Sequence, residues 1–468
     1  MVFSSHVFVY YFLPLLLLVY YNLPYRGRNL FVVLMSYAFY GWWNPWFMVL
    51  LFSSTVLNYA CGRIIGAPNA GRSARVTTLA VAIVLDLALL GFFKYFMFFT
   101  EGLSSLVEVF GRQALPVLRV TLPIGISFYT FQAISYVVDI YRGDAKPARS
   151  LIDYACFIAM FPHSIAGPIV RYHTIADQLV GREHTVERFS SGVSIFILGL
   201  AKKILLADTM GEIADAAFGA ASPAAVDAWF GAAAYAFQIY FDFAGYSDMA
   251  VGLARLLGFE LMKNFDAPYR ADSITDFWRR WHVSLSTFLR DYLYIPLGGN
   301  RKGPLRTYAN LAVVMLLGGL WHGAKWNFVA WGGYHGLLLG YERWRGKTSL
   351  YSRFPRMARI AITFVLTLFS WVLFRAENLT AAGQYLAAMF GLRPATSASM
   401  LLAAEMYTPR NLVFVAICGI LVLQPVQAFD WVRRPPGWLG SAALLALFAL
   451  ALALMSMQAF TPFLYFQF

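Results

Sequence analysis

Apolar runs that are long enough to cross a lipid bilayer, or nearly so, recur along the whole chain. They cover residues 7–23, 30–43, 46–61, 76–99, 120–141, 151–170, 189–207, 229–259, 308–320, 328–341, 360–374, 412–429 and 439–457. A hydrocarbon core of about 30 Å needs roughly 20 helical residues. Several runs are shorter or are broken by Gly and Pro, so we expect roughly 11–13 transmembrane or re-entrant helices. With 59% hydrophobic and 13% charged residues, the chain is predicted to be an all-α polytopic membrane protein.

The charged residues indicate how the chain is oriented. The 37 Lys and Arg residues outnumber the 24 Asp and Glu residues, which gives a formal charge of +13. In a membrane protein such an excess marks cytoplasmic loops, so we do not expect nucleic acid as a partner. Basic residues follow the first, third and fifth runs, which predicts an external N-terminus. The first residues lack a basic region and a cleavage signature, so we expect an uncleaved first helix.

No fixed-period repeat and no polar stretch of soluble-domain size interrupts the chain, which predicts one membrane domain over residues 1–468. The most polar region is 263–306. Ser273 followed by Asp276 is typical of a helix N-terminus. One face of the helix expected after it is apolar and carries Trp278, Trp281, His282, Leu285 and Leu289, whereas the other carries Arg279, Arg280 and Arg290. The spacing predicts a single amphipathic helix at the cytoplasmic interface.

Two histidines are the main candidates for chemistry. His322 lies in the apolar segment LLGGLWHGA (316–324), and His282 lies in WRRWHVSLS (278–286). Ionisable residues inside a membrane are functional candidates by default, and histidine suits general-base catalysis near neutral pH. An apolar environment favours the neutral imidazole, which can accept a proton. A structural hydrogen bond for His322 and an interfacial anchoring role for His282 remain the alternatives.

Other polar groups in apolar runs have simpler interpretations. For Asp242 and Asp248 we expect helix-cap or ion-pair roles, with Arg255 as one partner, or a place beside an aqueous cavity. His163 and His335 are interpreted as structural. The three cysteines lack paired spacing, and the histidines lack the spacing of metal ligands, so we expect neither disulfides nor a metal site.

Four motifs resemble the membrane-bound O-acyltransferase family. They are YFDFAGYSDMA (240–250), FWRRWHVSLS (277–286), DYLYIPLGG (291–299) and GLWHG (319–323). They are most similar to the bacterial branch of the family and to the membrane subunits of alginate O-acetylation. The opening MVFSS and the segment LPIGISFYTFQ (122–132) share this similarity, which therefore covers about residues 1–377 and leaves 378–468 as C-terminal helices.

The resemblance implies a helical bundle around a tunnel in a bacterial inner membrane, with a periplasmic N-terminus. His322 falls on the position of the family's catalytic histidine, and His282 on its second characteristic polar position. We expect His322 to act as general base, and His282 to position or polarise a thioester donor. That donor is expected to be acetyl-coenzyme A, with Trp278, Arg279 and Arg280 near its binding site and no permanently bound cofactor.

The implied reaction is acetyl transfer from the cytoplasmic donor toward an exported polysaccharide such as alginate, with membrane lipid around the protein and a periplasmic acetyltransferase as partner. Cellulose and peptidoglycan are alternative acceptors. Two other functions stay open at this stage. A proton-coupled transporter or export channel would use the same histidines as a relay, and would be expected to show repeat-related halves. A non-catalytic scaffold would tolerate the loss of His322.

Overall fold

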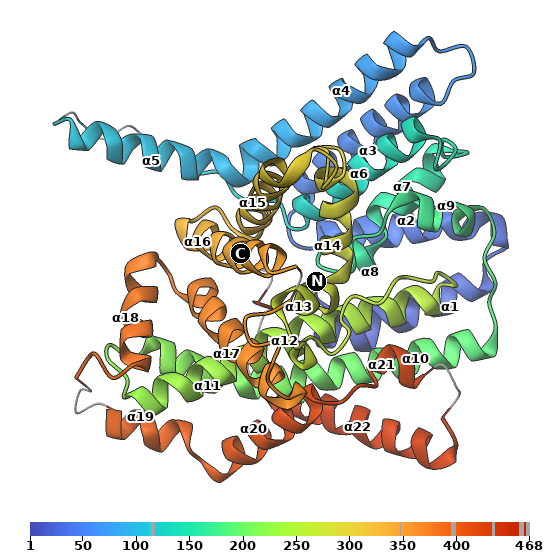
Figure 1. Ribbon diagram of the computed structural model, residues 1–468. Coiled ribbons are helices and arrows are strands. Elements are labelled where there is room, and N and C mark those ends of the chain that lie inside the picture. The colour runs from blue at the N-terminus through green and yellow to red at the C-terminus, as the bar shows by residue number, and fades with distance from the viewer. Residues whose placement is uncertain are drawn as a thin grey trace. The chain divides into compact units, whose positions relative to one another are not determined.

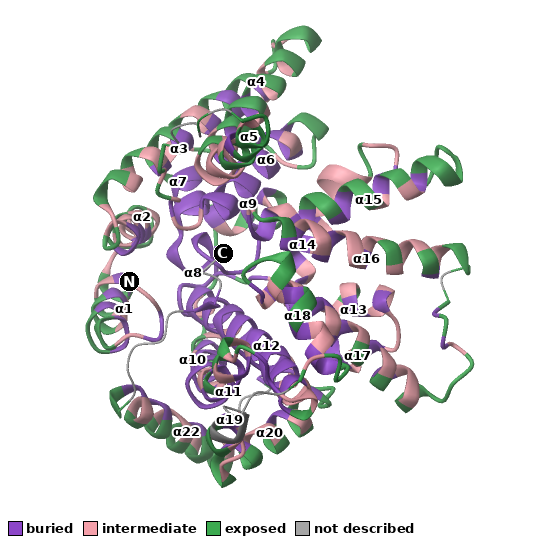
Figure 2. Cartoon of the chain, turned by 90° about the vertical axis from the view of Figure 1, so that its left-hand side faces the viewer, coloured by how far each residue is buried: buried purple, intermediate pink, exposed green. Residues whose placement is uncertain are grey.

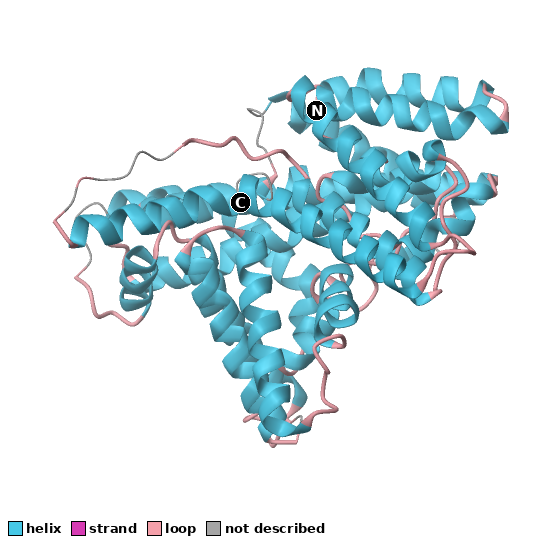
Figure 3. Ribbon diagram, turned by 90° about the horizontal axis from the view of Figure 1, so that it is seen from above, coloured by secondary structure: helices cyan, strands magenta, loops and turns pink. Residues whose placement is uncertain are grey.

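The computed structural model describes residues 1–111, 113, 118–346, 348–394, 399–432, 436–457 and 463–464. Throughout these ranges the regular structure is helical, without a β-strand (Figures 1 and 3). The chain forms two compact units. The first comprises residues 1–193 and 250–262, and the second comprises residues 194–249 and 263–468. The predicted all-α architecture is confirmed.

The first unit is built from short and medium helices. They are η1 (Val7–Phe12, a π-helical turn), α1 (Leu13–Asn22), α2 (Tyr25–Gly41), α3 (Pro45–Ile65), α4 (Arg72–Leu90), η2 (Gly91–Tyr95, π-helical), α5 (Phe96–Val109), α6 (Ile126–Arg142), α7 (Leu151–Ala159), α8 (Phe161–Ser164) and α9 (Tyr172–Val180). Local sequence sets several of their ends. Asn44 caps α3 and Ser150 caps α7, and each side chain accepts a hydrogen bond from a backbone N–H in the first turn.

The second unit contains the candidate site. Its elements are η3 (Lys202–Ala207, π-helical), α11 (Asp208–Gly219), η4 (Pro268–Arg270, a 3₁₀ turn), α13 (Ile274–Arg280), α14 (Val283–Leu289), η5 (Arg290–Tyr294, π-helical), α15 (Gly303–His322), α16 (Trp326–Trp344), α17 (Arg356–Arg375), α18 (Leu379–Met389), α19 (Ser399–Met406), α20 (Pro409–Val422), α21 (Ala428–Trp431) and α22 (Trp438–Met457). Two helices, α10 (Val186–Ala201) and α12 (Ala225–Leu256), belong partly to each unit.

Five helices in the described residues are long and apolar enough to cross a membrane. They are α3, the continuous stretch Arg72–Val109, the continuous stretch Val186–Gly219, α17 and α22. Their burial differs: 17% of the most apolar window is buried in Arg72–Val109 and in α22, against 67% in Val186–Gly219. Figure 2 shows the contrast between the largely exposed α4 and α22 and the buried α12. The protein is therefore an integral membrane protein, and its number of crossings stays a prediction.

Two expected elements differ from the structure. The run 151–170 is not one span, because α7 ends at Ala159 and Pro162 lies at the start of the four-residue α8. The single amphipathic helix predicted after Ser273 is wrong as well. It is divided into α13 and α14 at His282, whose backbone adopts a left-handed conformation with φ of 45°. The Ser273 N-cap itself is confirmed, since its side chain accepts a hydrogen bond from the Asp276 N–H.

Candidate active site

His322 is the last residue of α15 and lies at the turn into α16. The turn is narrow because Gly323 has no side chain: a Cβ added there would lie 2.2 Å from the Phe328 ring. The two helices also pack closely below the turn, where a Cβ on Gly319 would lie 2.2 Å from the Phe328 carbonyl oxygen. These glycines therefore hold His322 against α16 by close backbone contact.

Aromatic rings enclose the His322 imidazole, which is 5% exposed. The ring centroids of Trp321, Trp331 and Phe374 lie 5.1, 5.2 and 5.3 Å from it, in edge-to-face geometry. A small cavity of about 10 Å³, enough for roughly one water molecule, opens beside His322. Its walls come from distant parts of the second unit: Ile239, Asp242, Phe243, Trp281, His322, Trp331, Trp371, Phe374 and Leu464.

Asp242 is the charged residue in the cavity wall, and it belongs to a buried ion-pair cluster. The Lys203 Nζ lies 2.8 Å from an Asp242 carboxylate oxygen and 2.7 Å from one of Asp208. The second Asp242 oxygen accepts a hydrogen bond of 2.9 Å from the Leu464 N–H. The ion-pair expectation for Asp242 is thus confirmed, and the carboxylate also lines a cavity.

Asp248 forms an ion pair too, but with Lys202, at 2.6 Å. Arg255, the partner expected from the sequence, donates a hydrogen bond to the Ser191 hydroxyl. The two α12 carboxylates therefore pair with successive lysines of η3, Asp242 with Lys203 and Asp248 with Lys202. The two carboxylates lie six residues apart, which is about 1.7 helical turns.

His282 lies close to the His322 cavity and is completely buried. Its ring contacts Phe243, which lines the cavity, with centroids 4.7 Å apart, and Trp321, which also contacts His322, with centroids 5.9 Å apart. Its Nδ1 lies 3.2 Å from the Asn264 Oδ1. Burial lowers the pKa of His282 to about 3, so the ring is neutral. Both candidate histidines thus contact the same indole ring, that of Trp321.

A third histidine, His335, belongs to the same aromatic cluster. Its ring lies 5.0 Å from that of Trp331 in the cavity wall, and the Trp278 Nε1–H donates a 3.3 Å hydrogen bond to its Nδ1. Its interpretation as a structural residue fits this bond. Trp278 also packs edge-to-face on Trp331, with ring centroids 5.6 Å apart. The predicted donor-site tryptophan is therefore separated from the cavity by the Trp331 ring, which lines it.

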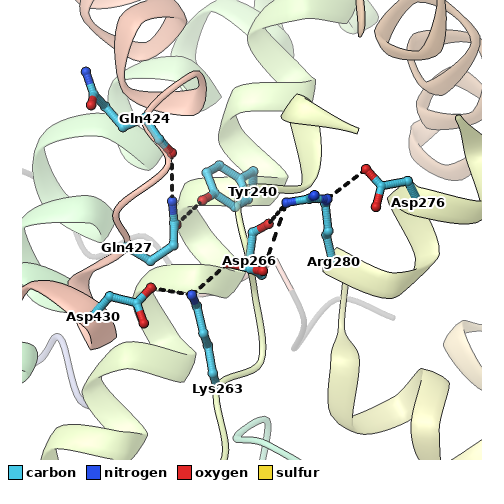
Figure 4. Close-up of polar contacts among 8 residues, drawn as sticks. All are labelled: Tyr240, Lys263, Asp266, Asp276, Arg280, Gln424, Gln427 and Asp430. Carbon is cyan, nitrogen blue, oxygen red and sulfur yellow. Dashed lines mark hydrogen bonds and ion pairs between the residues drawn. The ribbon is translucent and has the colours of Figure 1, made fainter. Parts of the chain in front are cut away.

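The two predicted donor-site arginines lie away from the cavity wall. Arg279 is exposed. The Arg280 side chain is engaged by Asp276, at 2.8 Å, and by Asp266, whose carbonyl oxygen accepts a 3.2 Å hydrogen bond (Figure 4). Arg280 therefore has a structural role, because it links α13 to the preceding loop. Arg279 is exposed on the protein surface, where its charge can attract an anion.

Several wall residues were not anticipated from the sequence. Trp331, Trp371 and Phe374 look like ordinary apolar residues of a membrane helix, and nothing in their spacing marks them. Lys203 did carry a signal, because a lysine inside the apolar run 189–207 must find a counter-charge. Asn264 carried no such signal, because a polar residue is not unusual within the polar segment 263–306.

The described residues contain no group of three or more His, Cys, Asp or Glu side chains arranged to hold a metal ion. The three cysteines are free and buried. His163 is buried as well, and its Nε2–H donates to the Phe157 carbonyl oxygen at 2.8 Å, in keeping with a structural role. The candidate chemistry therefore rests on imidazoles in an aromatic, largely apolar cavity with a single carboxylate in its wall.

Such an arrangement is suited to proton abstraction from a hydroxyl, because a neutral imidazole shielded from water accepts a proton without competition from bulk solvent. The comparison with known proteins identifies the class. The model of the membrane-bound O-acyltransferase family matches residues 147–382, which include His282 and His322. The chain belongs to this family.

Full-length relatives agree with that assignment. The chain is 44% identical over 503 residues to a probable alginate O-acetylase of Azotobacter vinelandii and 42% identical over 525 residues to one of Pseudomonas aeruginosa, with 100% of both chains covered in each case. It is 36% identical over 427 residues to a peptidoglycan O-acetyltransferase of Helicobacter pylori, covering 84% of this chain and 80% of that one. This membrane-bound O-acyltransferase is therefore an enzyme.

Proposed function

We propose that the protein transfers acetyl groups from acetyl-coenzyme A to a hydroxyl of an exported polysaccharide, and that this polysaccharide is alginate. The observation that carries the proposal is the identity of 42–44% with probable alginate O-acetylases over the full length of both chains. The proposed site is the aromatic cavity beside His322. In this account the enzyme lies in the bacterial inner membrane with its N-terminus in the periplasm.

His322 is proposed as the general base. Its ring nitrogen takes the proton of the acceptor hydroxyl as the oxygen attacks the acetyl carbon. The new carbon–oxygen bond forms, the carbon–sulfur bond of the thioester breaks, and the leaving thiolate takes the proton from the imidazolium. His322 is then neutral again. The edge-to-face contacts with Trp331 and Phe374 support this role, because they fix the imidazole plane before the substrate arrives.

The donor is proposed to approach from the cytoplasm. The segment 263–306 is rich in Lys and Arg, which disfavours translocation and would complement the phosphates of coenzyme A. Within it, the exposed Arg279 is better placed for this attraction than Arg280, which is already paired with Asp276. A periplasmic acetyltransferase is proposed as the partner that receives or completes the transfer.

The proposal is tested in a strain that makes alginate and lacks its own membrane O-acetylase. Expression of the wild-type chain should restore ester acetyl groups on the polymer, measured by ¹H NMR of the purified polysaccharide. The His322→Gln variant should restore none. His163→Gln is the matched control, because it replaces another buried histidine whose single hydrogen bond glutamine can reproduce. Unacetylated alginate with wild-type protein present in the membrane would refute the proposal.

Peptidoglycan is the second candidate acceptor, and the 36% identity with the Helicobacter pylori enzyme favours it over other polymers. The same cavity chemistry would serve, since both acceptors offer a sugar hydroxyl. The two are separated by expressing the chain in cells that make both polymers and measuring ester acetate on each. Acetate on the muropeptides alone would replace alginate by peptidoglycan in the proposal.

A further inference from the structure

The Asn264 carboxamide, in the loop before η4, is the hydrogen-bonding centre around His282. Its Oδ1 lies 3.2 Å from the His282 Nδ1, and it accepts hydrogen bonds from the Ser284 N–H at 3.2 Å and the Ser284 hydroxyl at 2.9 Å. Its Nδ2 donates to the Ser247 hydroxyl on α12 at 3.0 Å. The Asn264 backbone carbonyl also accepts a hydrogen bond from the Val283 N–H, at 2.9 Å. Asn264 is 3% exposed.

These contacts determine which nitrogen of His282 carries the hydrogen. A backbone N–H can only donate, so the Asn264 atom that Ser284 N–H contacts is the oxygen and not the amide nitrogen. An amide oxygen can only accept, so the His282 nitrogen that faces it must donate. The hydrogen is therefore on Nδ1, and the neutral ring has a lone pair at Nε2.

The Nε2 atom of His282 is buried and has no hydrogen-bond partner among the described residues. A buried polar atom without a partner is costly, and such atoms are characteristic of places where a ligand completes the bonding. The ring that carries it contacts Phe243 of the cavity wall and also Trp321, which contacts His322. The position and the lone pair together point to a substrate group that donates a hydrogen bond.

We propose that Asn264 is a positioning residue that holds His282 in the tautomer with a bare Nε2, and that this nitrogen accepts a hydrogen bond from an O–H or N–H of the bound substrate. The inference rests on the proposed function for the identity of that substrate. It differs from the expectation that His282 polarises the thioester carbonyl, because polarising a carbonyl oxygen requires a hydrogen at Nε2.

The loop that carries Asn264 is held in place on both sides. Lys263 forms ion pairs with Asp266, at 2.7 Å, and with Asp430 on α21. The Asp266 N–H donates to the Arg280 carbonyl oxygen at 2.9 Å, and Arg280 in turn binds Asp276. Figure 4 shows this chain of contacts from α21 through the loop to α13. The network fixes the loop against α13, whose last residue, Arg280, lies two positions before His282.

The tautomer can be measured without any substrate. The full-length protein is labelled with ¹⁵N in its seven histidine rings and studied by NMR in lipid nanodiscs, with the His282 signals assigned by their loss in His282→Gln. We expect a protonated Nδ1 and a bare Nε2. His335 serves as an internal reference, because its Nδ1 accepts from the Trp278 indole and its hydrogen therefore belongs on Nε2. A hydrogen on the His282 Nε2 would overturn the inference.

Variants of Asn264 test its positioning role. Asn264→Asp keeps an acceptor for Nδ1 and should keep the tautomer. Asn264→Leu removes the amide oxygen and frees the Ser284 hydroxyl, which lies 3.3 Å from Nδ1 and can then donate to it, so this variant should populate the other tautomer. Asn310→Leu is the matched control. Asn310 is also a buried amide, and it donates to the carbonyl oxygens of Leu297 and Gly299, so its loss should leave the His282 signals unchanged. An unchanged tautomer in Asn264→Leu would refute the role.

Kinetics of acetyl transfer supply the functional readout. Asn264→Leu should lower kcat/KM by about 10- to 100-fold, the range found when hydrogen-bond partners of metal-binding histidines are removed. Asn264→Asp should retain most activity but move the acid limb of the pH profile to higher pH, because a carboxylate favours the charged imidazolium, which has no lone pair. An acid limb that stays in place would contradict the positioning role.

The His282→Ala variant identifies the source of the substrate hydrogen. A rise in KM for the polysaccharide alone indicates an acceptor hydroxyl, and a rise in KM for acetyl-coenzyme A alone indicates an amide N–H of the donor. Unchanged values of both KM would refute a hydrogen bond to bound substrate. The two proposals fail separately: wild-type protein that moves no acetyl group would refute the proposed function, whereas the tautomer would still be decided by the NMR spectra.

Discussion

The buried lysine Lys203 provides a stringent test of how the core beside the cavity is stabilised. Its side chain is 2% exposed and bridges two carboxylates, Asp242 at 2% and Asp208 at 10% exposure. Replacing it by methionine removes the charge and shortens the unbranched side chain by one atom. Both carboxylates then lose their counter-charge in a largely buried site. We predict that Lys203→Met is severely destabilising.

The magnitude follows from the geometry. Removing one partner of a buried ion pair costs about 3–5 kcal/mol, because the other charge is left uncompensated. With two carboxylates affected, the loss should be at the upper end of that range. Lys202 is the matched control, because it is the adjacent residue on the same turn and pairs with one carboxylate, Asp248, through side chains that are 18% and 17% exposed. Lys202→Met should therefore cost less, about 1–3 kcal/mol.

The assay is reversible unfolding of the purified protein in mixed micelles with increasing SDS, followed by far-UV circular dichroism. Adding Asp242→Asn to Lys203→Met should recover part of the loss, because one of the two unbalanced carboxylates is removed. A loss below about 1 kcal/mol for Lys203→Met, or equal losses for the two lysine variants, would refute the buried-pair account.

Three further predictions concern packing, a helix terminus and pH. Gly319→Ala should destabilise the protein by about 1–3 kcal/mol, because its Cβ would meet the Phe328 carbonyl oxygen at 2.2 Å; Gly333→Ala, with its nearest neighbour at 3.8 Å, should be close to neutral in the same unfolding assay. Glu342→Gln should cost about 1–3 kcal/mol, since the carboxylate accepts three hydrogen bonds at the start of α13; an unchanged unfolding midpoint would contradict this. His282 stabilises the fold fully above its unfolded pKa of 6.5 and progressively less as the pH falls toward its folded pKa of about 3, because the unfolded chain takes up the proton first. Between pH values of about 6.5 and 5.5 the wild type should therefore lose about 1 kcal/mol more than His282→Gln, and parallel losses would refute the buried neutral imidazole.

The sequence predicted the features that depend on local composition. Apolar runs indicated the helical membrane architecture, and Ser273 with Asp276 indicated the start of α13. The break at His282 was not predictable, because the apolar spacing continues across it. Hydrogen bonds from Val283 and Ser284 to Asn264 impose the left-handed backbone, and those contacts exist only in the folded protein. Tertiary hydrogen bonding thus overrode a valid helical period.

In the candidate site, too, the sequence predicted what depends on local composition but not what depends on tertiary contacts. His322 and His282 were recognisable because an imidazole is unusual in such surroundings. The walls of the cavity were not, because Trp331, Trp371 and Phe374 come from α16 and α17 and differ in no local respect from other apolar residues. The tautomer of His282 required the position of the Asn264 oxygen, which no pattern in the sequence encodes.

The central claim is that His322 is the base of an acetyl transfer. The most direct measurement uses the purified enzyme in proteoliposomes, with radiolabelled acetyl-coenzyme A and an alginate oligosaccharide on opposite sides and the gradient collapsed by an uncoupler. With the proposed periplasmic acetyltransferase added on the side of the sugar, wild type and His163→Gln should transfer label to the sugar hydroxyl, and His322→Gln should transfer about 100-fold less or none. Transfer by His322→Gln at the wild-type rate, with the protein correctly folded, would contradict the account.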